Sequence, residues 1–468
     1  MRLWIDVEDF FAHAAVSTRP SGIQRLTYEV YAALRGCAAT PDAVQFVRHD
    51  GSSGLRSIAW DEIDALFQRL SNGAAPPPPP AQAQSGPSAT QARLRHLAFR
   101  LAPELREAAV SAALSSARAL AALATAARLW ARLATTMLRR ITASRPTPAF
   151  PIDTSAVRDF KTSVQPGDVL GIFGSHWHDP THAARVASLR QAHGLQVAVL
   201  VYDLIPVRFA EFCSPGVVQR FHAWMGAMLD QADQVFAISN ATADDTRAYA
   251  AETGRRLSRP IVVTPIGTGF GDRPAPIRTQ RLPTGPYVLF VSSIEVRKNH
   301  LLAFRAWKRL LSLLPREQVP ALVFAGRQGP MVGDLMQQIA NTQNLGGKLI
   351  IIDDPSDGEL AALYEGCRFS LFPSFAEGWG LPVTESLGYG RPCLIAHATS
   401  LPEAAGPGAI SFDPDNLGDA VDKLVTLITD ETAFSAWTTA TVGQFRPIPW
   451  TETARCLLRT LSPASDPR

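Results

Sequence analysis

The chain has 468 residues and a mass of 50.6 kDa, more than one hydrophobic core usually supports, so its length predicts two domains. Apolar residues make up 46% and charged residues 19%, a composition that excludes a wholly disordered chain. The net charge of +3 gives no indication of nucleic-acid binding. Residues 91–145, however, hold ten arginines against two glutamates, a local charge of +8, so the rest of the chain is mildly acidic.

The pattern of cysteines and apolar residues predicts a cytoplasmic protein. Five cysteines lie far apart and show no spacing typical of metal or disulfide pairs, which indicates a reducing compartment (Cys37, Cys213, Cys367, Cys393 and Cys456). The first apolar stretch is interrupted by Asp6, Glu8 and Asp9, unlike the core of a signal peptide. No stretch reaches the ~18 uncharged apolar residues of a membrane span. We therefore expect a cytoplasmic protein. Peripheral binding at the inner face of the plasma membrane is compatible with this expectation.

In the first half of the chain, apolar runs alternate with helical patterns. The run RLWIDV at residues 2–7 predicts a strand. Behind Ser21, a plausible N-cap, apolar residues recur at helical spacing (Ile23, Leu26, Val30 and Leu34). Further strands are expected at 44–47, 168–173, 197–204 and 234–239. Because such alternation favours a parallel sheet with crossover helices, residues 1–270 are predicted to form a Rossmann-like domain.

Residues 72–150 do not follow this alternation of apolar runs and helical patterns. Its first part, 72–90, has linker composition and includes five consecutive prolines from Pro76 to Pro80. After the linker, apolar residues between Leu123 and Ile141 share one face of a helical wheel, roughly opposite several arginines. We expect a helical insertion in the first domain. Its basic amphipathic face is suited either to an anionic membrane surface or to packing on its own domain or another subunit.

A second set of strands follows a passage rich in glycine and proline at 265–286, which we interpret as the domain boundary. The predicted strands are the runs YVLFVSS, ALVFAG, KLIIID, FSLFPS and PCLIA, and helical stretches such as 301–314 and 360–364 lie between them. Both halves are thus predicted to be α/β domains with doubly wound sheets, the second over 283–445. Ligands of such sheets bind at the carboxyl ends of the strands, so we expect the site in a cleft that both domains face.

The strongest local signal is LFPSFAEGWGLPVTESLGYGRPCLIA at residues 371–396. Here a strand runs into a glycine-rich turn that holds Glu377, and Pro382 can open a helix that carries Glu385. Gly378 and Gly380 permit close approach of the backbone to a ligand, and the start of the helix can hold an anion such as a diphosphate. Because glycine-rich turns are common, the residues alone leave open a purely structural strand-to-helix turn.

This segment resembles the retaining GT-B glycosyltransferases of glycosyltransferase family 4. Glu377 and Glu385 match the Glu-x7-Glu motif, and the flanking residues match almost throughout, with Trp379, Ser386 and Gly388 as the departures. The resemblance implies a GT-B fold. It also implies that Glu377 contacts the donor sugar together with the backbone of Gly378, Trp379, Gly380 and Leu381. Glu385 would then bind the ribose of the nucleotide.

A second match lies at VLFVSSIEVRKNHLLAFRAW, residues 288–307. Arg297 and Lys298 are residue types suited to clamping a diphosphate and to stabilising its growing charge, although such a pair before a helix is commonly just solvated surface. The run is similar to the Gly-Ser/Thr-x-Glu-x-Arg-Lys-Asn pattern of polysaccharide-building members of the family. Ser292 or Ser293 stands where some relatives carry a further arginine, and Ser293 is our candidate donor contact. By the same resemblance, the backbone of Ile352 lies near the base.

Candidate residues of the first domain lie in two short runs and one turn. The run SGIQR at 21–25 looks like the loop that closes over the donor, with Gly22 for close approach and Arg25 toward the cleft. The run VYDLIPVRFAEF at 201–212 looks like the family's His-Asp-Leu-Ile-Pro segment, with Tyr202 replacing histidine. Asp203 is either a cleft carboxylate or a loop cap. Ser239 begins a turn that resembles one at the cleft edge.

Three histidines, His176, His178 and His182, cluster in the run GSHWHDPTH. Grouped imidazoles can bind a metal ion, but no cysteine accompanies them. We prefer a loop at the end of a strand, where Trp177 stacks on a sugar and His176 or His178 hydrogen-bonds acceptor hydroxyls. We expect neither a metal nor another cofactor.

The resemblance implies transfer of a glycosyl group from a nucleotide-diphosphate sugar to an acceptor hydroxyl, with retained anomeric configuration and with cationic side chains in place of a metal. The variant motifs are similar to those of mannosyltransferases and related enzymes that build surface polysaccharides. This implies GDP-mannose as the first donor to test and a polyprenyl-linked saccharide as acceptor. It also implies that the tail, 446–468, crosses back to the first domain from Trp450. Alternatives are another GT-B nucleotide-sugar enzyme such as an epimerase, or a catalytically inactive sugar-nucleotide-binding scaffold.

Overall fold

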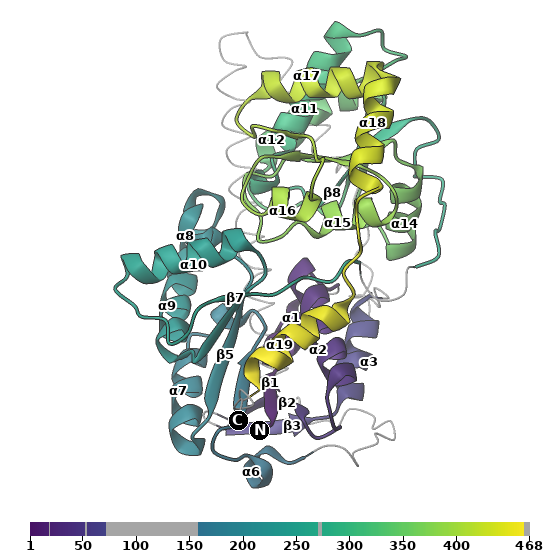
Figure 1. Cartoon of the computed structure of the whole chain (residues 1–468). Coiled ribbons are helices and arrows are strands. Elements are labelled where there is room, and N and C mark those ends of the chain that lie inside the picture. Colours follow the sequence, from purple (N-terminus) through teal and green to yellow (C-terminus); the bar gives the residue numbers. More distant parts are fainter. Residues whose placement is uncertain (18, 52–53, 72–157, 270–273, 463–468) are drawn as a thin grey trace, which may run out of the picture. The chain divides into compact units, whose positions relative to one another are not determined.

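The computed structural model describes residues 1–17, 19–51, 54–71, 158–269 and 274–462 (Figure 1). The predicted insertion, including the basic stretch 91–145, lies outside the described residues. All described residues belong to one compact unit, which contains two sheets. This agrees with the predicted pair of α/β domains, and we call them the first and second domain in chain order.

The first domain is built on a seven-stranded sheet of order β3-β2-β1-β4-β5-β6-β7. All neighbouring strands are parallel except β2 and β3, which pair antiparallel with Phe46 opposite Ile58. The strands are β1 (Leu3–Asp6), β2 (Val44–Asp50), β3 (Gly54–Ile58), β4 (Val169–Ile172), β5 (Gln196–Val201), β6 (Gln234–Ala237) and β7 (Val262–Val263). Strand β3 was not among the predicted strands.

Helices cover both faces of this sheet, so its strands are apolar at successive residues. In β5, for example, Val199 packs into the core beneath one layer of helices and Leu200 into the core beneath the other. The helices of the first domain are α1 (Glu8–Val16), α2 (Gly22–Cys37), α3 (Trp60–Ser71), α6 (Phe160–Ser163), η1 (His176–His178), α7 (His182–His193), α8 (Ile205–Arg208), η2 (Ala210–Phe212), α9 (Pro215–Gln231) and α10 (Asn240–Glu252).

Helix α1 lies between the predicted first strand and the helix behind Ser21, where no element was predicted. The chain forms a helix directly after β1, with Glu8 and Asp9 in its first turn, where acidic residues favour helix formation. Ser21 does precede α2 as its N-cap residue, but its hydroxyl bonds the side chain of Gln24 instead of a backbone N–H group. Gly22 therefore begins a helix and is not part of an extended loop.

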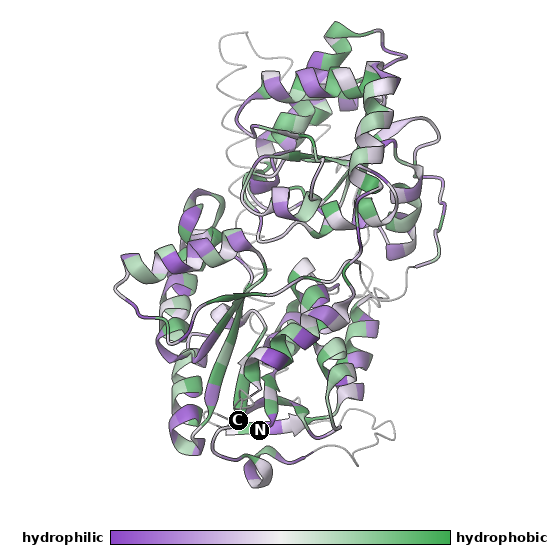
Figure 2. Ribbon diagram, in the orientation of Figure 1, coloured by the Kyte–Doolittle hydropathy of each residue, from purple (hydrophilic) through white to green (hydrophobic). Residues whose placement is uncertain are grey.

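The second domain is built on an all-parallel six-stranded sheet of order β10-β9-β8-β11-β12-β13. The strands are β8 (Tyr287–Val291), β9 (Ala321–Ala325), β10 (Leu349–Ile352), β11 (Phe369–Phe372), β12 (Cys393–Ala396) and β13 (Ser411–Phe412). Its helices are η3 (Val296–Lys298), α11 (His300–Leu313), α12 (Gly333–Asn341), α13 (Gln343–Gly347), α14 (Asp357–Gly366), α15 (Leu381–Gly388), α16 (Leu401–Ala405), α17 (Leu417–Thr429) and α18 (Glu431–Val442). Figure 2 shows apolar strands between helices of mixed polarity.

The last helix, α19 (Trp450–Leu461), follows the second domain in sequence but packs against α2 of the first. Its apolar residues Ala454 and Leu457 are fully buried in the same core as Leu26 and Val30 of α2. Trp450 begins the helix, and its indole donates to the carbonyl of Gly269 at 2.8 Å. The chain thus passes between the two domains both in the segment that leads into β8 and in the segment that leads from α18 to α19.

Each sheet has a point at which the strand order reverses, between β1 and β4 in the first and between β8 and β11 in the second. Loops at the carboxyl ends of such strand pairs leave a crevice that binds ligands in doubly wound folds. In the second domain these loops are residues 292–299 after β8 and 373–380 after β11. Both conspicuous motifs of the sequence therefore lie at the reversal point of one sheet.

Candidate active site

Arg297 and Lys298 converge on Glu377. The two cations lie in η3 after β8, and the carboxylate lies in the loop after β11. Lys298 Nζ is 2.6 Å from Oε1 of Glu377, and Arg297 Nη1 is 3.0 Å from Oε2. Arg297 also binds Glu295 at 2.9 Å and donates to the carbonyl of Ala376 at 2.5 Å. One carboxylate thus holds both cations next to the glycine-rich turn.

This cluster is largely buried, so its charges act strongly on one another. Burial opposes ionisation of Glu377, but the charges of Arg297 and Lys298 lower its pKa to about 2. Burial and the charge of Arg297 lower the pKa of Lys298, against the effect of Glu377. Burial also works against the charge of Arg297, yet Glu377 and Glu295 raise its pKa above the usual arginine value. The site therefore holds two cations that pair with two carboxylates, Glu377 and Glu295.

The turn after Glu377 presents backbone donors. Among the described residues, the N–H groups of Gly378, Trp379, Gly380 and Leu381 donate no hydrogen bond. The turn is held from behind by Ser400, whose hydroxyl lies 2.9 Å from the carbonyl of Glu377 and 2.8 Å from that of Trp379. Four successive free N–H groups ahead of a helix can hold anionic or hydroxyl oxygens of a ligand.

Two glycines of this turn are required by geometry. A Cβ atom on Gly378 would lie 2.1 Å from the carbonyl oxygen of Tyr202, so the backbone of the second domain approaches that of the first too closely for any side chain. Gly380 has a φ of 123°, which L-residues rarely adopt. The close approach that the sequence led us to expect toward a ligand is, at Gly378, an approach to Tyr202.

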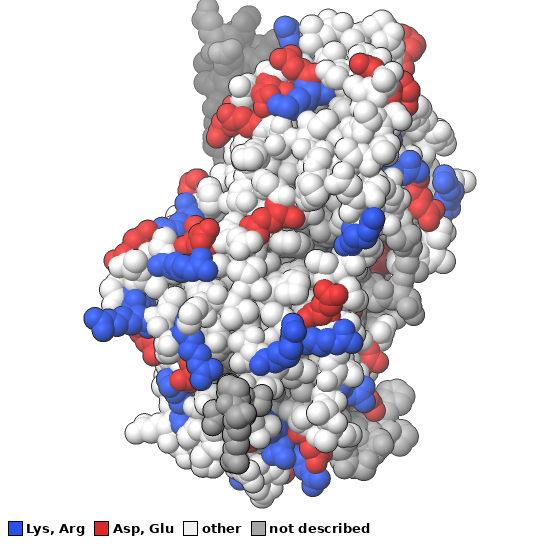
Figure 3. Space-filling view, viewed as in Figure 1, with Lys and Arg blue, Asp and Glu red and all other residues white. Residues whose placement is uncertain are grey.

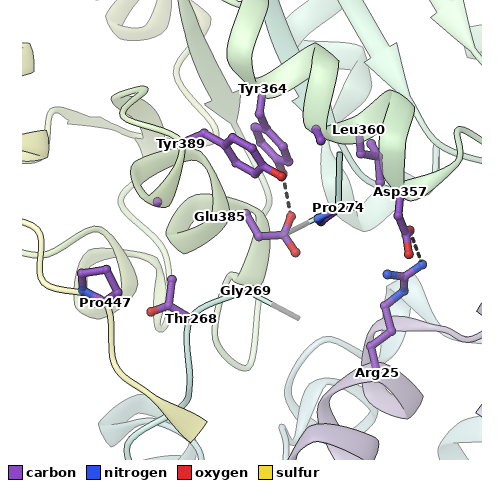
Figure 4. Close-up of a pocket in the computed structure, with 12 residues that line it drawn as sticks. Arg25, Thr268, Gly269, Pro274, Asp357, Leu360, Tyr364, Glu385, Tyr389 and Pro447 are labelled. Atoms are coloured by element: carbon purple, nitrogen blue, oxygen red, sulfur yellow. Dashed lines mark hydrogen bonds and ion pairs between the residues drawn. The ribbon is translucent and has the colours of Figure 1, made fainter. Parts of the chain in front are cut away.

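Glu385 lies on α15 and lines a pocket of about 260 Å³ (Figure 4). Tyr364 of α14 donates to Oε2 of Glu385 at 2.8 Å, and the Tyr389 ring stacks on that of Tyr364. Burial raises the pKa of Glu385, against the effect of the Tyr364 hydrogen bond and of Arg25. The pocket also contains Thr268, so residues of both domains line it.

Arg25 of α2 lines the same pocket, where its guanidinium group points to Asp357. Its guanidinium group forms an ion pair with Asp357, the first residue of α14, at 2.6 Å. Arg19, which precedes α2, pairs with Asp354 at 3.1 Å. Gly22 lies between these arginines in sequence, and a Cβ atom there would meet nothing within 4 Å. Its lack of a side chain is therefore not required by packing among the described residues.

Asp203 makes the hydrogen bond of a loop cap, and its predicted role as a cleft carboxylate stays a prediction. Its Oδ1 accepts a hydrogen bond from the N–H of Ile205 at 3.0 Å, as a loop cap does. Burial raises its pKa, while the charge of Arg297 lowers it, so the carboxyl group is also coupled electrically to the cation cluster. Tyr202, at the histidine position of the family pattern, is buried and donates its hydroxyl to the carbonyl of Phe173. Asp203 is therefore the first-domain carboxylate that is coupled to the cluster.

The three histidines after β4 have different surroundings. His176 is buried, His178 is exposed, and the Trp177 ring lies edge-on to Phe221 and Trp224 of α9. Trp177 thus packs against the core of the first domain, and its predicted stacking on a sugar stays a prediction. The predicted acceptor roles of His176 and His178 stay untested as well.

His176 and His182 also belong to a buried group in which their ring nitrogens and an Asp6 oxygen lie within 4.8 Å of one another. Trp224 donates its indole N–H to Nδ1 of His182 at 3.2 Å. The proton of neutral His182 therefore lies on Nε2, which points to the Asp6 carboxylate at 3.3 Å. A metal ligand needs a lone pair at that nitrogen, and its other nitrogen normally donates a hydrogen bond. The hydrogen bonds in this group thus oppose metal binding at Nε2 of His182.

The structure also describes three other residues of the predicted site, Ser239, Ser293 and Ile352. Ser239 is fully buried and caps α10 by accepting the N–H of Thr242 at 3.0 Å, so helix capping accounts for its side chain, and its place at the cleft edge stays a prediction. Ser293 is exposed. Ile352 is buried at the end of β10, and its carbonyl accepts from Gly326 at 3.0 Å. Ser356 and Glu359 form a complete capping box at the start of α14.

Sequence reasoning missed residues that support the site from behind. Tyr364 binds Glu385, and Thr399 exchanges two 2.9 Å hydrogen bonds with the backbone of Glu377. Glu403 accepts from the N–H groups of Asn240 and Ala241 at the start of α10. Nothing in the sequence marked these residues, because each acts on a partner far away along the chain.

Figure 3 shows acidic and basic side chains interspersed over the face in view. No helix in the described ranges combines the length and hydrophobicity needed to span a lipid bilayer. The basic excess of the sequence thus falls largely on residues outside the described ranges.

Comparison with known proteins gives one family match. Residues 275–441 match the family described as Glycosyl transferases group 1, and this range includes Arg297, Lys298, Glu377 and Glu385. Serotype-specific mannosyltransferase WbdA of Escherichia coli is 26% identical over 265 residues, which are 53% of this chain and 32% of WbdA. The O-antigen chain mannosyltransferase B of Escherichia coli is 27% identical over 176 residues, 38% of this chain and 45% of that protein. The chain thus spans about a third of the length of the first relative and less than half of the second.

Among solved structures, Anabaena Alr3699/HepE in complex with UDP and glucose is similar over 98% of this chain and 99% of its own, with a TM-score of 0.56 and 13% sequence identity. At this identity the likeness concerns the fold. It extends over both domains, whereas the family match lies in the second. The chain therefore has the GT-B fold and carries a glycosyl transferases group 1 domain.

Proposed function

We propose that the protein is a retaining glycosyltransferase of glycosyltransferase family 4, which moves a sugar from a nucleotide-diphosphate sugar to a hydroxyl group of a saccharide acceptor. The observation that carries the proposal is the convergence of Arg297 and Lys298 on Glu377, beside four free backbone N–H groups, within the range that matches the group 1 family. Cations, a carboxylate and backbone donors are the groups that a diphosphate and a sugar need together.

In this proposal the donor diphosphate lies against Arg297, Lys298 and the start of α15. The two cations stabilise the negative charge that grows on the leaving diphosphate, an effect that is large in a site that excludes water. Glu377 accepts from sugar hydroxyls and holds both cations in place before the donor binds. Glu385 binds the ribose from the pocket beside Tyr364, as the family resemblance implies.

Retention of configuration requires that the acceptor attack on the face from which the diphosphate leaves. A carboxylate with a pKa of about 2 is a weak base, so Glu377 is poorly suited to accept the proton of the acceptor hydroxyl. This supports a same-face reaction in which the leaving phosphate takes that proton. In this proposal the carboxyl group of Asp203, whose pKa burial raises, holds the acceptor.

The relatives support the choice of sugar and pathway. Both curated relatives described above are named mannosyltransferases, and one is named for the O-antigen chain. We therefore propose GDP-mannose as donor, a polyprenyl-linked saccharide as acceptor and cell-surface polysaccharide synthesis as the process. A metal ion is not needed in this proposal, because Arg297 and Lys298 supply positive charge where a metal would otherwise do so.

We also propose that the basic stretch 91–145 attaches the enzyme to an anionic membrane surface at the cytoplasmic face. Its local charge of +8 supports this, since each basic residue near such a surface contributes about 1 kcal/mol. Co-sedimentation of the full chain with vesicles of anionic or neutral lipid tests it. Equal binding to both vesicle types, or none to either, would remove the membrane role.

The enzyme proposal is tested by incubating the purified protein with GDP-mannose and with a panel of UDP- and dTDP-sugars. We expect slow release of nucleoside diphosphate from one donor, faster release with a saccharide acceptor, and thermal stabilisation by the same donor. An epimerase would instead convert the donor without transferring it, and a scaffold would bind without release. If no donor yields nucleoside diphosphate, the proposal is wrong.

A further inference from the structure

The side chain of Tyr364 connects the core of the second domain to the pocket around Glu385. Its ring is 2% exposed and packs with Leu363 and Cys367 beneath the sheet. Its hydroxyl lies 2.8 Å from Oε2 of Glu385 and 3.4 Å from the carbonyl of Pro382. A phenol has one proton, so the shorter contact is the hydrogen bond.

The geometry leaves this tyrosine little freedom. Its ring stacks on Tyr389 with centroids 5.2 Å apart and planes 10° from parallel. Burial raises the pKa of its phenol well above the usual value, so the hydroxyl keeps its proton and remains a donor at every working pH. Side chains locked by packing hold their partners more accurately than side chains on mobile loops.

Glu385 therefore has one committed oxygen and one open oxygen. Among the described residues, no donor binds Oε1. Glu385 lines the pocket, and Figure 4 shows its carboxylate group there. The charged groups that act on it are Arg25 of α2, which lowers its pKa, and Asp357 of α14, which raises it. Burial raises that pKa, and the Tyr364 hydrogen bond and the charge of Arg25 oppose this rise.

We propose that Tyr364 is a positioning residue for nucleotide binding: it fixes Oε2 of Glu385, so that Oε1 accepts from the hydroxyl groups of the nucleoside sugar. This inference rests on the proposed function, in which Glu385 binds ribose. It adds a residue that lies outside the glycine-rich turn and the cation cluster, and that acts on the ligand only through Glu385.

The test compares Tyr364→Phe with Tyr287→Phe as a matched control. Tyr287 is also buried in the second domain, and its hydroxyl donates at 2.7 Å to the carbonyl of Leu363, away from the pocket. Calorimetric titration with GDP and with UDP, from pH 5 to pH 8, measures affinity. We expect Tyr364→Phe to bind about tenfold more weakly at pH 7, because an unsatisfied, poorly held carboxylate loses its ligand contact, while Tyr287→Phe binds within twofold of the unaltered protein.

The pH profile separates positioning from mere stability. Loss of the donor raises the pKa of Glu385, so the acid limb of binding moves to higher pH in Tyr364→Phe. Replacement of Tyr364 by 3-fluorotyrosine keeps the shape of the side chain and makes its hydroxyl a stronger donor. The acid limb of binding should therefore move to lower pH. This variant also tests the proposal if Tyr364→Phe does not fold. Titration of the nucleotide phosphate is common to all variants and cancels in the comparison.

Unchanged affinity and an unchanged acid limb in Tyr364→Phe, or an unmoved limb with 3-fluorotyrosine, would overturn the role of Tyr364 alone. Failure of the unaltered protein to bind GDP or UDP would instead overturn the proposed function, and this inference with it. Wild-type binding together with opposite shifts in the two variants supports both.

Discussion

The ammonium group of Lys298 lies 2.6 Å from Oε1 of Glu377, although the two residues are 79 positions apart in sequence. They come from loops after β8 and β11, the two strands that flank the reversal point of the second sheet. The ion pair thus joins both motifs of the sequence in one site. A donor diphosphate would add a further anion to two cations that already pair with Glu377 and Glu295.

Replacing Lys298 by alanine is expected to lower the turnover of sugar transfer by at least about 100-fold, because a charge-stabilising group is lost at the leaving diphosphate. We expect the melting temperature to change little, in contrast to this large loss of turnover. Lys308→Ala is a matched control, since Lys308 is exposed on α11. Steady-state kinetics and thermal melts of both variants measure the effect. Proportional loss of folding and activity in Lys298→Ala would contradict the catalytic role.

The low pKa of Glu377 predicts a dependence of stability on pH. Its pKa of about 2 in the folded protein lies below the usual value of ~4.3, so ionised Glu377 stabilises the native state above about pH 4. This contribution is lost as pH falls from there toward 2. Urea unfolding at pH 3 to 6 should therefore show a weaker pH dependence in Glu377→Gln than in the unaltered protein.

The exposed Glu317 offers the control for this experiment, because Glu317→Gln removes a carboxylate from the surface of the same domain. Its unfolding free energy should follow that of the unaltered protein between pH 3 and 6. Equal slopes for all three proteins would show that the cation cluster does not hold the Glu377 charge in the folded state.

Two glycines should respond oppositely to alanine. Gly378→Ala places a Cβ 2.1 Å from the carbonyl of Tyr202, so we expect a loss of about 1–3 kcal/mol in unfolding free energy and loss of transfer. Gly22→Ala meets nothing within 4 Å at the start of α2, so unfolding free energy should be unchanged or rise by about 0.4–1 kcal/mol. If Gly22 makes room for the donor, the same variant weakens donor binding. Chemical unfolding and titration of donor measure the two effects separately.

Chelation of metal ions is expected to leave transfer unchanged. The Asp6, His176 and His182 group contains possible ligands, but Trp224 directs the proton of His182 onto the nitrogen that a metal would need. Elemental analysis of the purified protein, with activity measured before and after EDTA, checks this. Stoichiometric bound metal, or activity that EDTA removes and a divalent ion restores, would contradict it.

Much of the fold could be predicted because buried parallel strands are apolar at successive residues. The runs at 197–204 and 369–374 illustrate this, since both faces of their strands are covered by helices. Helix α1 could not be predicted in this way, because its apolar residues continue the run of the preceding strand. The pairing of strand β3 is decided by its antiparallel hairpin partner β2.

The sequence by itself determined the residue types of the site, since the spacing of Glu377 and Glu385 and the Arg297–Lys298 pair are local patterns. Only the tertiary structure decided their relations: Glu377 is neutralised by cations 79 and 80 residues away, Glu385 is held by Tyr364, and Gly378 faces Tyr202 of the other domain. The physical reason is that charge coupling, hydrogen bonding and steric contact depend on distance in space, whereas a sequence pattern records only separation along the chain.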